Sequence, residues 1–64
     1  MSYILFEVWE EDEIGHQELI ETTASEKQAR DIAEGLLGQG ALAVVIYQES
    51  ETGDPILVAR LEAG

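Results

Sequence analysis

The side chains of this sequence with the most chemical potential are carboxylates, and they crowd into two short stretches. Residues 10–13 are four consecutive acids shortly before Gly15, and a second acidic group lies between residues 49 and 54. Paired carboxylates perform general acid–base chemistry when one of them is desolvated. Both stretches are rich in turn-forming residues, so we expect water to keep these groups ionised. The acidic candidates are Glu10, Glu11, Asp12, Glu13, Glu49, Glu51 and Asp54.

The parts of a nucleophilic catalyst are missing from the sequence. It contains no cysteine, a single histidine and no Gly-x-Ser-x-Gly motif, so it has neither an activated thiol nor a serine elbow. His16 has the chemistry of a base, but a lone histidine beside a turn and several acids is typical of a solvated surface residue. We therefore predict a protein that is not an enzyme and has no catalytic residues.

Carboxylates also bind Ca²⁺, but their spacing here does not fit a calcium loop. An EF-hand loop needs ligands at fixed positions and a bidentate Glu at the twelfth. Residues 10–13 lack this spacing, and a loop beginning at Glu49 would place Gly53 fifth and Arg60 twelfth. Gly35, Gly38 and Gly40 lie at the C-terminal end of a predicted helix, where the helix dipole repels phosphate. We predict neither a metal site nor a cofactor.

The remaining use of the carboxylates is as a charged surface. Residues i and i+2 of a strand share a face about 6.7 Å apart. Pairs such as Glu49 and Glu51 would therefore present repeated negative charge, as a nucleic-acid backbone does. The alternative is that the acids only keep a small protein soluble. The sequence favours mimicry of DNA because the charge is large, lies mostly outside the predicted helix and accompanies an aromatic sheet face.

Length and charge limit the class of protein. The 64 residues make a single domain, residues 1–64, with 14 acids, 3 bases and a formal net charge of −11. This charge disfavours nucleic acid and anionic lipid as direct partners and favours a basic protein surface. The sequence has no basic leader and no apolar run near the roughly 20 residues of a membrane span. We expect a cytoplasmic protein.

The clearest signal for secondary structure lies between Ser25 and Gly40. Ser25 is a good N-cap and Gln28 its capping-box partner, while Gly38 and Gly40 allow the helix to end. Apolar residues between them recur at helical spacing and form one stripe that must be buried. The stripe consists of Ala29, Ile32, Ala33, Leu36 and Leu37.

Four predicted strands flank this helix, at residues 2–10, 16–23, 41–48 and 56–61. The second has acidic side chains that protect an edge strand, and the third is the most continuous apolar run, as in a central strand. We predict an α+β fold in two layers with the order ββαββ, a four-stranded antiparallel sheet with one helix packed on one face. The two acidic turns then lie at opposite ends of the sheet.

The first strand determines what the two faces of the sheet present. Its alternation places Ile4, Phe6 and Val8 on the face towards the core. The other face is left open to solvent or to a partner, and Trp9 on it is a candidate anchor for that partner. The residues predicted on the open face are Tyr3, Leu5, Glu7 and Trp9.

In length, acidity, lack of cysteine and strand–helix order, the chain resembles the small acidic anti-CRISPR proteins of phages, in particular an inhibitor of the type I-C system. The resemblance implies a protein of the host bacterial cytoplasm that imitates duplex DNA. It would occupy the surface of the Cascade complex, on the large subunit, that reads the protospacer-adjacent motif, and so exclude target DNA. No functional residue follows from a motif, so the predicted partner-binding residues are the seven acids above and Trp9.

Two other classes of function remain open. One is a structural or regulatory interaction module, as a monomer or as a weak homodimer that pairs its open faces through Tyr3, Leu5 and Trp9. A mass that rises with concentration would favour it. The other is a weak enzyme or ligand-binding domain, which requires a concave pocket around His16 or Glu7.

Overall fold

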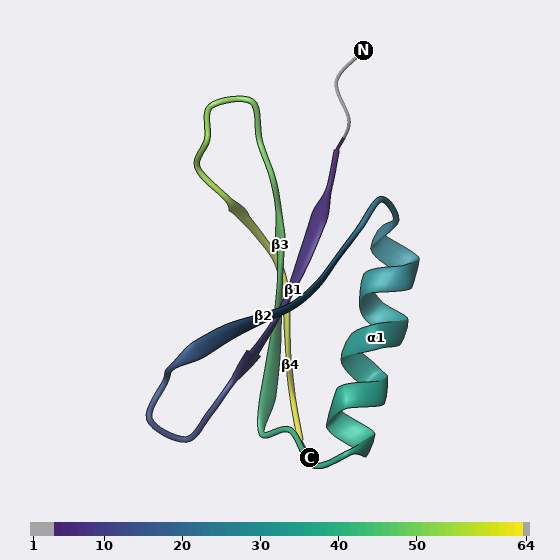
Figure 1. Cartoon of the computed structure of the whole chain (residues 1–64), viewed down its shortest axis with the longest axis vertical. Coiled ribbons are helices and arrows are strands. Elements are labelled where there is room, and N and C mark those ends of the chain that lie inside the picture. Colours follow the sequence, from purple (N-terminus) through teal and green to yellow (C-terminus); the bar gives the residue numbers. More distant parts are fainter. Residues whose placement is uncertain (1–3, 64) are drawn as a thin grey trace.

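A computed structural model describes residues 4–63 of the chain, in which four strands and one helix form two layers (Figure 1). The predicted α+β fold of ββαββ order is confirmed, with a four-stranded antiparallel sheet and one helix packed on one face. The elements are β1 (Phe6–Glu11), β2 (Gln17–Thr23), α1 (Glu26–Gly38), β3 (Ala43–Gln48) and β4 (Ile56–Glu62).

The strands are arranged in the order β2-β1-β3-β4, so β1 and β3 are central and β2 and β4 are edges. The predictions of an edge strand after the first turn and of a central strand after the helix are both confirmed. β3 begins at Ala43 rather than at residue 41. β1 begins at Phe6, four residues later than predicted, and Tyr3 lies outside the described residues.

Helix α1 begins and ends where its sequence predicts, but among residues 4–63 the Gln28 side chain does not return the second hydrogen bond of the predicted capping box. The Ser25 side chain accepts a hydrogen bond from the backbone N–H of Gln28, at 3.4 Å. At the other end, the N–H of Gly40 donates to the carbonyl of Leu37 and that of Ala41 to the carbonyl of Leu36. This pair of bonds is a Schellman motif, which requires a left-handed residue, and Gly40 has φ 109°. The helix is therefore fixed at both ends by local interactions.

The hydrophobic core lies between α1 and the sheet. Val8, Val44 and Ile46 are fully buried on the side of the sheet that faces the helix. Ala29 and Ala33 of the helix are also fully buried, and their small side chains allow the helix to approach the strands closely. Larger apolar residues pack around this centre: Phe6, Ile32, Leu36, Leu37, Val58, Ala59 and Leu61.

The prediction that Ile4 lies in the core is wrong. Its side chain is 52% exposed. The pairing of β1 with its neighbours begins only at Phe6, which lies opposite Gln48 and Thr23. Ile4 therefore precedes the paired segment, where the alternation of a strand no longer fixes which way a side chain points.

The register of the strands sets the two hairpin turns far apart. Glu11 lies opposite Ala43, which in turn lies opposite Glu62, so the β1–β2 turn adjoins the start of β3 and the end of β4. Phe6 lies opposite Gln48, which leads into the β3–β4 turn. The molecule is 37 Å long, and the two turns lie at opposite ends of it (Figure 1). This arrangement of the two acidic turns is the one predicted.

Candidate acidic interaction surface

The face of the sheet away from α1 carries its own small cluster of side chains. Because Val8, Val44 and Ile46 point to the helix, their neighbours along β1 and β3 point to the open face. The register places Trp9 opposite Val45, and Val45 is opposite Arg60 of β4. Val45 is only 2% exposed although no helix lies over it. The side chains around it therefore form a cover on this face.

Trp9, the predicted anchor, lies on the open face and is held by its neighbours. Its indole N–H donates to Oε1 of Glu7 at 3.1 Å. Its ring meets that of Tyr47 edge-on, with centroids 6.5 Å apart and planes at 87°, an arrangement favoured by the charge distribution of aromatic rings. The Tyr47 hydroxyl donates to Oε1 of Gln17 at 3.4 Å. Trp9 is thus a rigid, half-buried part of the surface.

Glu11 is neutralised within the molecule. One carboxylate oxygen lies 2.6 Å from Nη2 of Arg60, and the other accepts a hydrogen bond from the Gln17 amide at 3.0 Å. The hydrogen bond from Arg60, and after it that from Gln17, lowers the pKa of Glu11 below its ordinary value. Arg60 also donates to Oε1 of Glu62 at 3.1 Å, and the two carboxylates raise the pKa of the guanidinium above its ordinary value. Glu11 therefore adds less to the outward field than its charge suggests.

Asp12 builds the β1–β2 turn. Its Oδ1 accepts hydrogen bonds from the backbone N–H groups of Ile14, at 3.1 Å, and His16, at 2.8 Å. Gly15 has φ 87° and donates its N–H to the carbonyl of Asp12. The turn predicted at this place is confirmed, and Asp12 has a structural task in it. The neighbouring Glu13 is exposed, and its side chain makes no hydrogen bond to another of residues 4–63.

The structure brings three of the predicted residues to one hollow. The hollow, about 500 Å³ in volume, lies between the β1–β2 turn and the adjoining ends of β3 and β4. Glu11, Asp12 and Glu13 line it together with Arg60 and with Glu62, a carboxylate that the sequence did not single out. Glu10 alternates with Glu11 and points to the helix side of the sheet instead. Neither His16 nor Glu7 lines this hollow.

The other predicted acids lie at the far end of the molecule. Glu49, Glu51 and Asp54 are exposed in the β3–β4 turn. The Ser50 hydroxyl donates to the carbonyl of Asp54 at 2.6 Å and the backbone carbonyl of Ser50 accepts from Gly53. The turn is therefore held by Ser50 rather than by its acids. These three carboxylates form no ion pair with the described bases, and they are not part of the first group.

The sequence prediction missed a row of acids on the helix side of the β1–β2 hairpin. Val8 lies opposite Glu21 and Glu10 opposite Glu18, whereas Trp9 between them faces two residues of β2, of which Leu19 is its partner. This bulge adds one residue to β2, so Glu18 and Glu21 share a face although they are three apart. The signal for this bulge in the sequence is the pair of successive apolar residues Leu19 and Ile20. The row consists of Glu10, Glu18 and Glu21.

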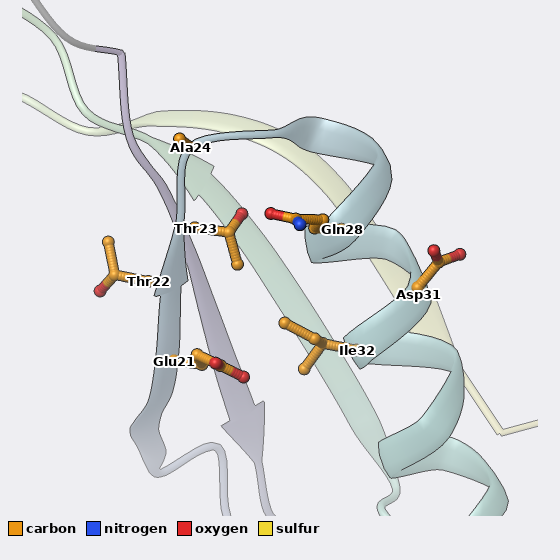
Figure 2. A pocket seen from close by; sticks show the side chains of 7 residues that line it. All are labelled: Glu21, Thr22, Thr23, Ala24, Gln28, Asp31 and Ile32. Carbon is orange, nitrogen blue, oxygen red and sulfur yellow. The ribbon is translucent and has the colours of Figure 1, made fainter.

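A shallow groove runs beside this row, between β2 and α1 (Figure 2). Thr23, Gln28 and Ile32 point into it and Thr22 points away. Gln28, expected to complete a capping box, lines the groove. Asp31 at its rim is bound by Lys27 at 3.0 Å. Every buried side-chain polar atom among residues 4–63 has a hydrogen-bond partner, so none is aimed at a ligand here.

Charge is divided unevenly among the three parts of the fold. The β1–β2 hairpin, residues 6–23, contains seven acids and no base. In α1, Lys27 and Arg30 pair with Asp31 and Glu26, one turn away in each case. In the β3–β4 hairpin, Arg60 offsets part of the charge. The largest uncompensated negative surface is therefore the β1–β2 hairpin.

Two kinds of site are not found in the part of the chain that the structure describes. Residues 4–63 contain no group of three or more His, Cys, Asp or Glu side chains placed to hold a metal ion. Among the same residues, no helix has the length and apolar character to cross a membrane. What the exposed carboxylates form is a charged surface.

Comparison of the chain with protein-family models, with curated proteins and with solved structures gives no match. Its function is therefore inferred from the fold and from the acidic surface.

Proposed function

We propose that this protein is a non-enzymatic acidic inhibitor that imitates DNA and occupies the basic, DNA-binding surface of a bacterial protein complex. The target we propose is the type I-C Cascade complex, because of the resemblance of the sequence to anti-CRISPR proteins, and the inhibitor would act in the bacterial cytoplasm. One observation carries the proposal: the β1–β2 hairpin has seven acids and no base.

The dimensions of the molecule support an imitation of duplex DNA. Its length of 37 Å is close to one turn of B-DNA, about 34–36 Å. One such turn carries roughly 20 phosphate charges, and the formal net charge of −11 is about half of that. A basic surface that fits one turn of DNA would therefore contact a protein of similar length but lower charge density.

The ion pairs of the Lys and Arg side chains support a protein partner rather than a nucleic acid. The sequence has 3 bases, and each of them has a carboxylate within 3.1 Å. Among residues 4–63, no Lys or Arg side chain is therefore left without a carboxylate partner. Carboxylates without such a partner remain at Glu10, Glu13, Glu18 and Glu21 of the hairpin, and a surface rich in Lys and Arg would be attracted to them.

The predicted contact residues have unequal parts in this proposal. Glu10 and Glu13 join Glu18 and Glu21 as the principal contacts, whereas Trp9 lies on the opposite, open face of the sheet. Glu11 and Asp12 chiefly hold the surface in shape, because one pairs with Arg60 and the other builds the turn. The far turn, with Glu49, Glu51 and Asp54, forms a second contact where the partner's basic surface extends along the whole molecule.

The test uses purified type I-C Cascade, labelled target DNA and the full chain. We expect the protein to displace DNA, and we expect its direct binding to DNA-free Cascade to weaken as salt is raised. The chain mixed with DNA alone serves as the control and should show no binding. DNA that stays on Cascade, together with no direct binding at low salt, would contradict the proposal.

A second candidate function is an interaction module that acts as a homodimer through its open faces. The observation in its favour is that Leu19 and Leu57, 46% and 59% exposed, flank Trp9 and Tyr47 on that face. This function would leave Cascade unaffected. A mass that rises with concentration, reduced by charged substitutions at either leucine, would support it.

A further inference from the structure

The two edge strands of the sheet differ in their side chains. β2 carries Glu18 and Glu21 and no base. β4 carries one acid and one base, Glu62 and Arg60, which bind each other at 3.1 Å, and its other five residues are apolar. Both strands contain a bulge, so they differ in chemistry rather than in regularity. The outer side of β4, here called the β4 edge, is therefore apolar and has no net charge of its own.

The apolar part of the β4 edge has no partner among residues 4–63. Ile56 is 52% and Leu57 59% exposed, and because they are consecutive they project to opposite faces of the sheet. β4 is the last strand in the order of the sheet, so the N–H and C=O groups on its outer side pair with no other strand of these residues. Such an edge can accept an added strand, which main-chain hydrogen bonds hold and alternate side chains select.

Both ends of the β4 edge are acidic. The turn before β4 contains Glu49, Glu51 and Asp54 and no base. The hollow at the other end is lined by four carboxylates and one guanidinium, and Glu62 of β4 is one of the four. β4 has 7 residues and is therefore about 20 Å long, more than twice the Debye length of about 8 Å. The two ends therefore attract cations independently of each other.

We propose that the β4 edge binds an extended segment of another protein, apolar in its middle and with Lys or Arg at both ends. The segment adds a fifth strand to the sheet and places its apolar side chains beside Ile56 and Leu57. Its basic ends lie beside the two acidic ends of β4. Charge determines this choice of partner, because a second copy of the chain, with a net charge of −11, would bring acids to the same two places.

The β2 edge does not suit the same segment. Glu18 and Glu21 would lie beside its apolar middle and lose contact with water, which is costly for a charged group. Because β2 and β4 are opposite edges of the sheet, a segment on β4 leaves these two carboxylates exposed. The proposed binding at β4 therefore goes beyond the inhibitor function and does not depend on it.

The test titrates the full, isotope-labelled chain with a synthetic peptide of alternating Val and Thr that has two Lys residues at each end. We expect a dissociation constant below about 1 mM that rises with salt. In NMR spectra, the largest shifts and the largest gain in hydrogen-exchange protection should occur at β4 amides. One control peptide has its Lys residues in the middle, and another is N-methylated at its central residues and cannot pair as a strand. Each should bind at least about tenfold more weakly.

Two variants of the chain locate the binding. Leu57→Lys places a cation beside the apolar middle of the peptide and should raise the dissociation constant about tenfold or more. Leu19→Lys, the matched control, makes the same change on the same face at the β2 edge and should alter the constant by less than about twofold. Both leucines are exposed, so neither substitution removes a core residue.

Four results would overturn the proposal. The first is no binding of the peptide at low salt. The second is equal binding of the three peptides, because charge alone would then hold them. The third is protection of β2 amides in place of β4 amides. The fourth is a mass above 7.0 kDa without peptide, together with β4 protection that rises with protein concentration, because a second copy would then cover the edge. The three peptides are compared on the unaltered chain, so this comparison is decisive even if a variant does not fold.

Discussion

The β1–β2 and β3–β4 hairpins each supply one central and one edge strand to the sheet, yet they expose different chemistry. The first has seven acids and no base along residues 6–23. The second has an apolar edge, with its base Arg60 held between Glu11 and Glu62. Their buried sides are alike, because Val8 and Ile46 meet in one core. The fold thus needs the same interior from both hairpins, and the difference between their outer surfaces is free to serve binding.

Like charges within the β1–β2 hairpin also indicate that the fold does not determine its outer surface. Glu10 lies directly opposite Glu18, and like charges at opposed positions of a sheet are destabilising. A sequence selected for stability alone would place a base at one of these positions. We infer that the carboxylates of this hairpin are kept for a partner.

The largest effect on stability should come from the core that the hairpins share. Ile46→Ala removes most of a fully buried side chain and should cost about 2–5 kcal/mol, a large part of the total stability of so small a domain, about 5 kcal/mol. Both hairpins should unfold in one transition, observed by tryptophan fluorescence from β1 and by hydrogen exchange in β4. Separate transitions for the two would show that they do not share one core.

An intermediate effect on stability should come from the ion pair between Glu11 and Arg60, which joins the two hairpins. This effect should depend on pH. The pKa of Glu11 is lowered in the folded protein, chiefly by Arg60. Its contribution to stability is therefore present above the pKa of the unfolded chain, near 4.5, and is lost as pH falls through the lower folded value.

Chemical denaturation at several pH values measures this contribution. Glu11→Gln should be less stable than the unaltered protein at neutral pH, and the difference should shrink as the pH is lowered below 4.5. In an Arg60→Met background the same substitution should have a smaller effect, because only the hydrogen bond from Gln17 then remains. A difference that is undiminished without Arg60 would show that this ion pair does not connect the hairpins.

The smallest effect should come from the opposed carboxylates of the first hairpin. Glu18→Gln removes one of the two like charges and should stabilise the protein by about 0.2–1 kcal/mol. Glu51→Gln, in the turn of the other hairpin, makes the same chemical change without an opposed partner and should have a smaller effect. Denaturant midpoints compare the two. Equal increases in stability from the two substitutions would mean that the loss of net charge, rather than the loss of the opposed pair Glu10 and Glu18, stabilises the protein.

The sequence was sufficient to predict those parts of the fold that depend on neighbouring residues. The cap at Ser25, the end of the helix at Gly40 and the apolar run of β3 are all local signals, and together they predicted the order of elements and the open face. The acidic turns followed from the antiparallel path of the chain. Local patterns therefore gave the layers and the ends of the sheet correctly.

What the sequence could not predict depends on register between distant strands. Glu11 and Arg60 are far apart in the chain and meet only because both strands pair with β3. The bulge beside Leu19 and Ile20 changes which acids share a face, and so the row with Glu21 was missed. Ile4 was assigned to the core because alternation was continued beyond the paired part of β1. Pairing, rather than composition, decides these features.

The central claim is that the first hairpin, and not acidity in general, binds the partner. Its most direct test compares two triple variants that remove the same charge in competition with target DNA for type I-C Cascade. One is Glu10→Gln, Glu18→Gln and Glu21→Gln in the β1–β2 hairpin, and the other is Glu49→Gln, Glu51→Gln and Asp54→Asn in the β3–β4 turn. We expect the first to need at least about tenfold more protein for half-displacement, equivalent to about 1.4 kcal/mol, and the second to need less than about threefold more. Equal losses from both triples would contradict the claim.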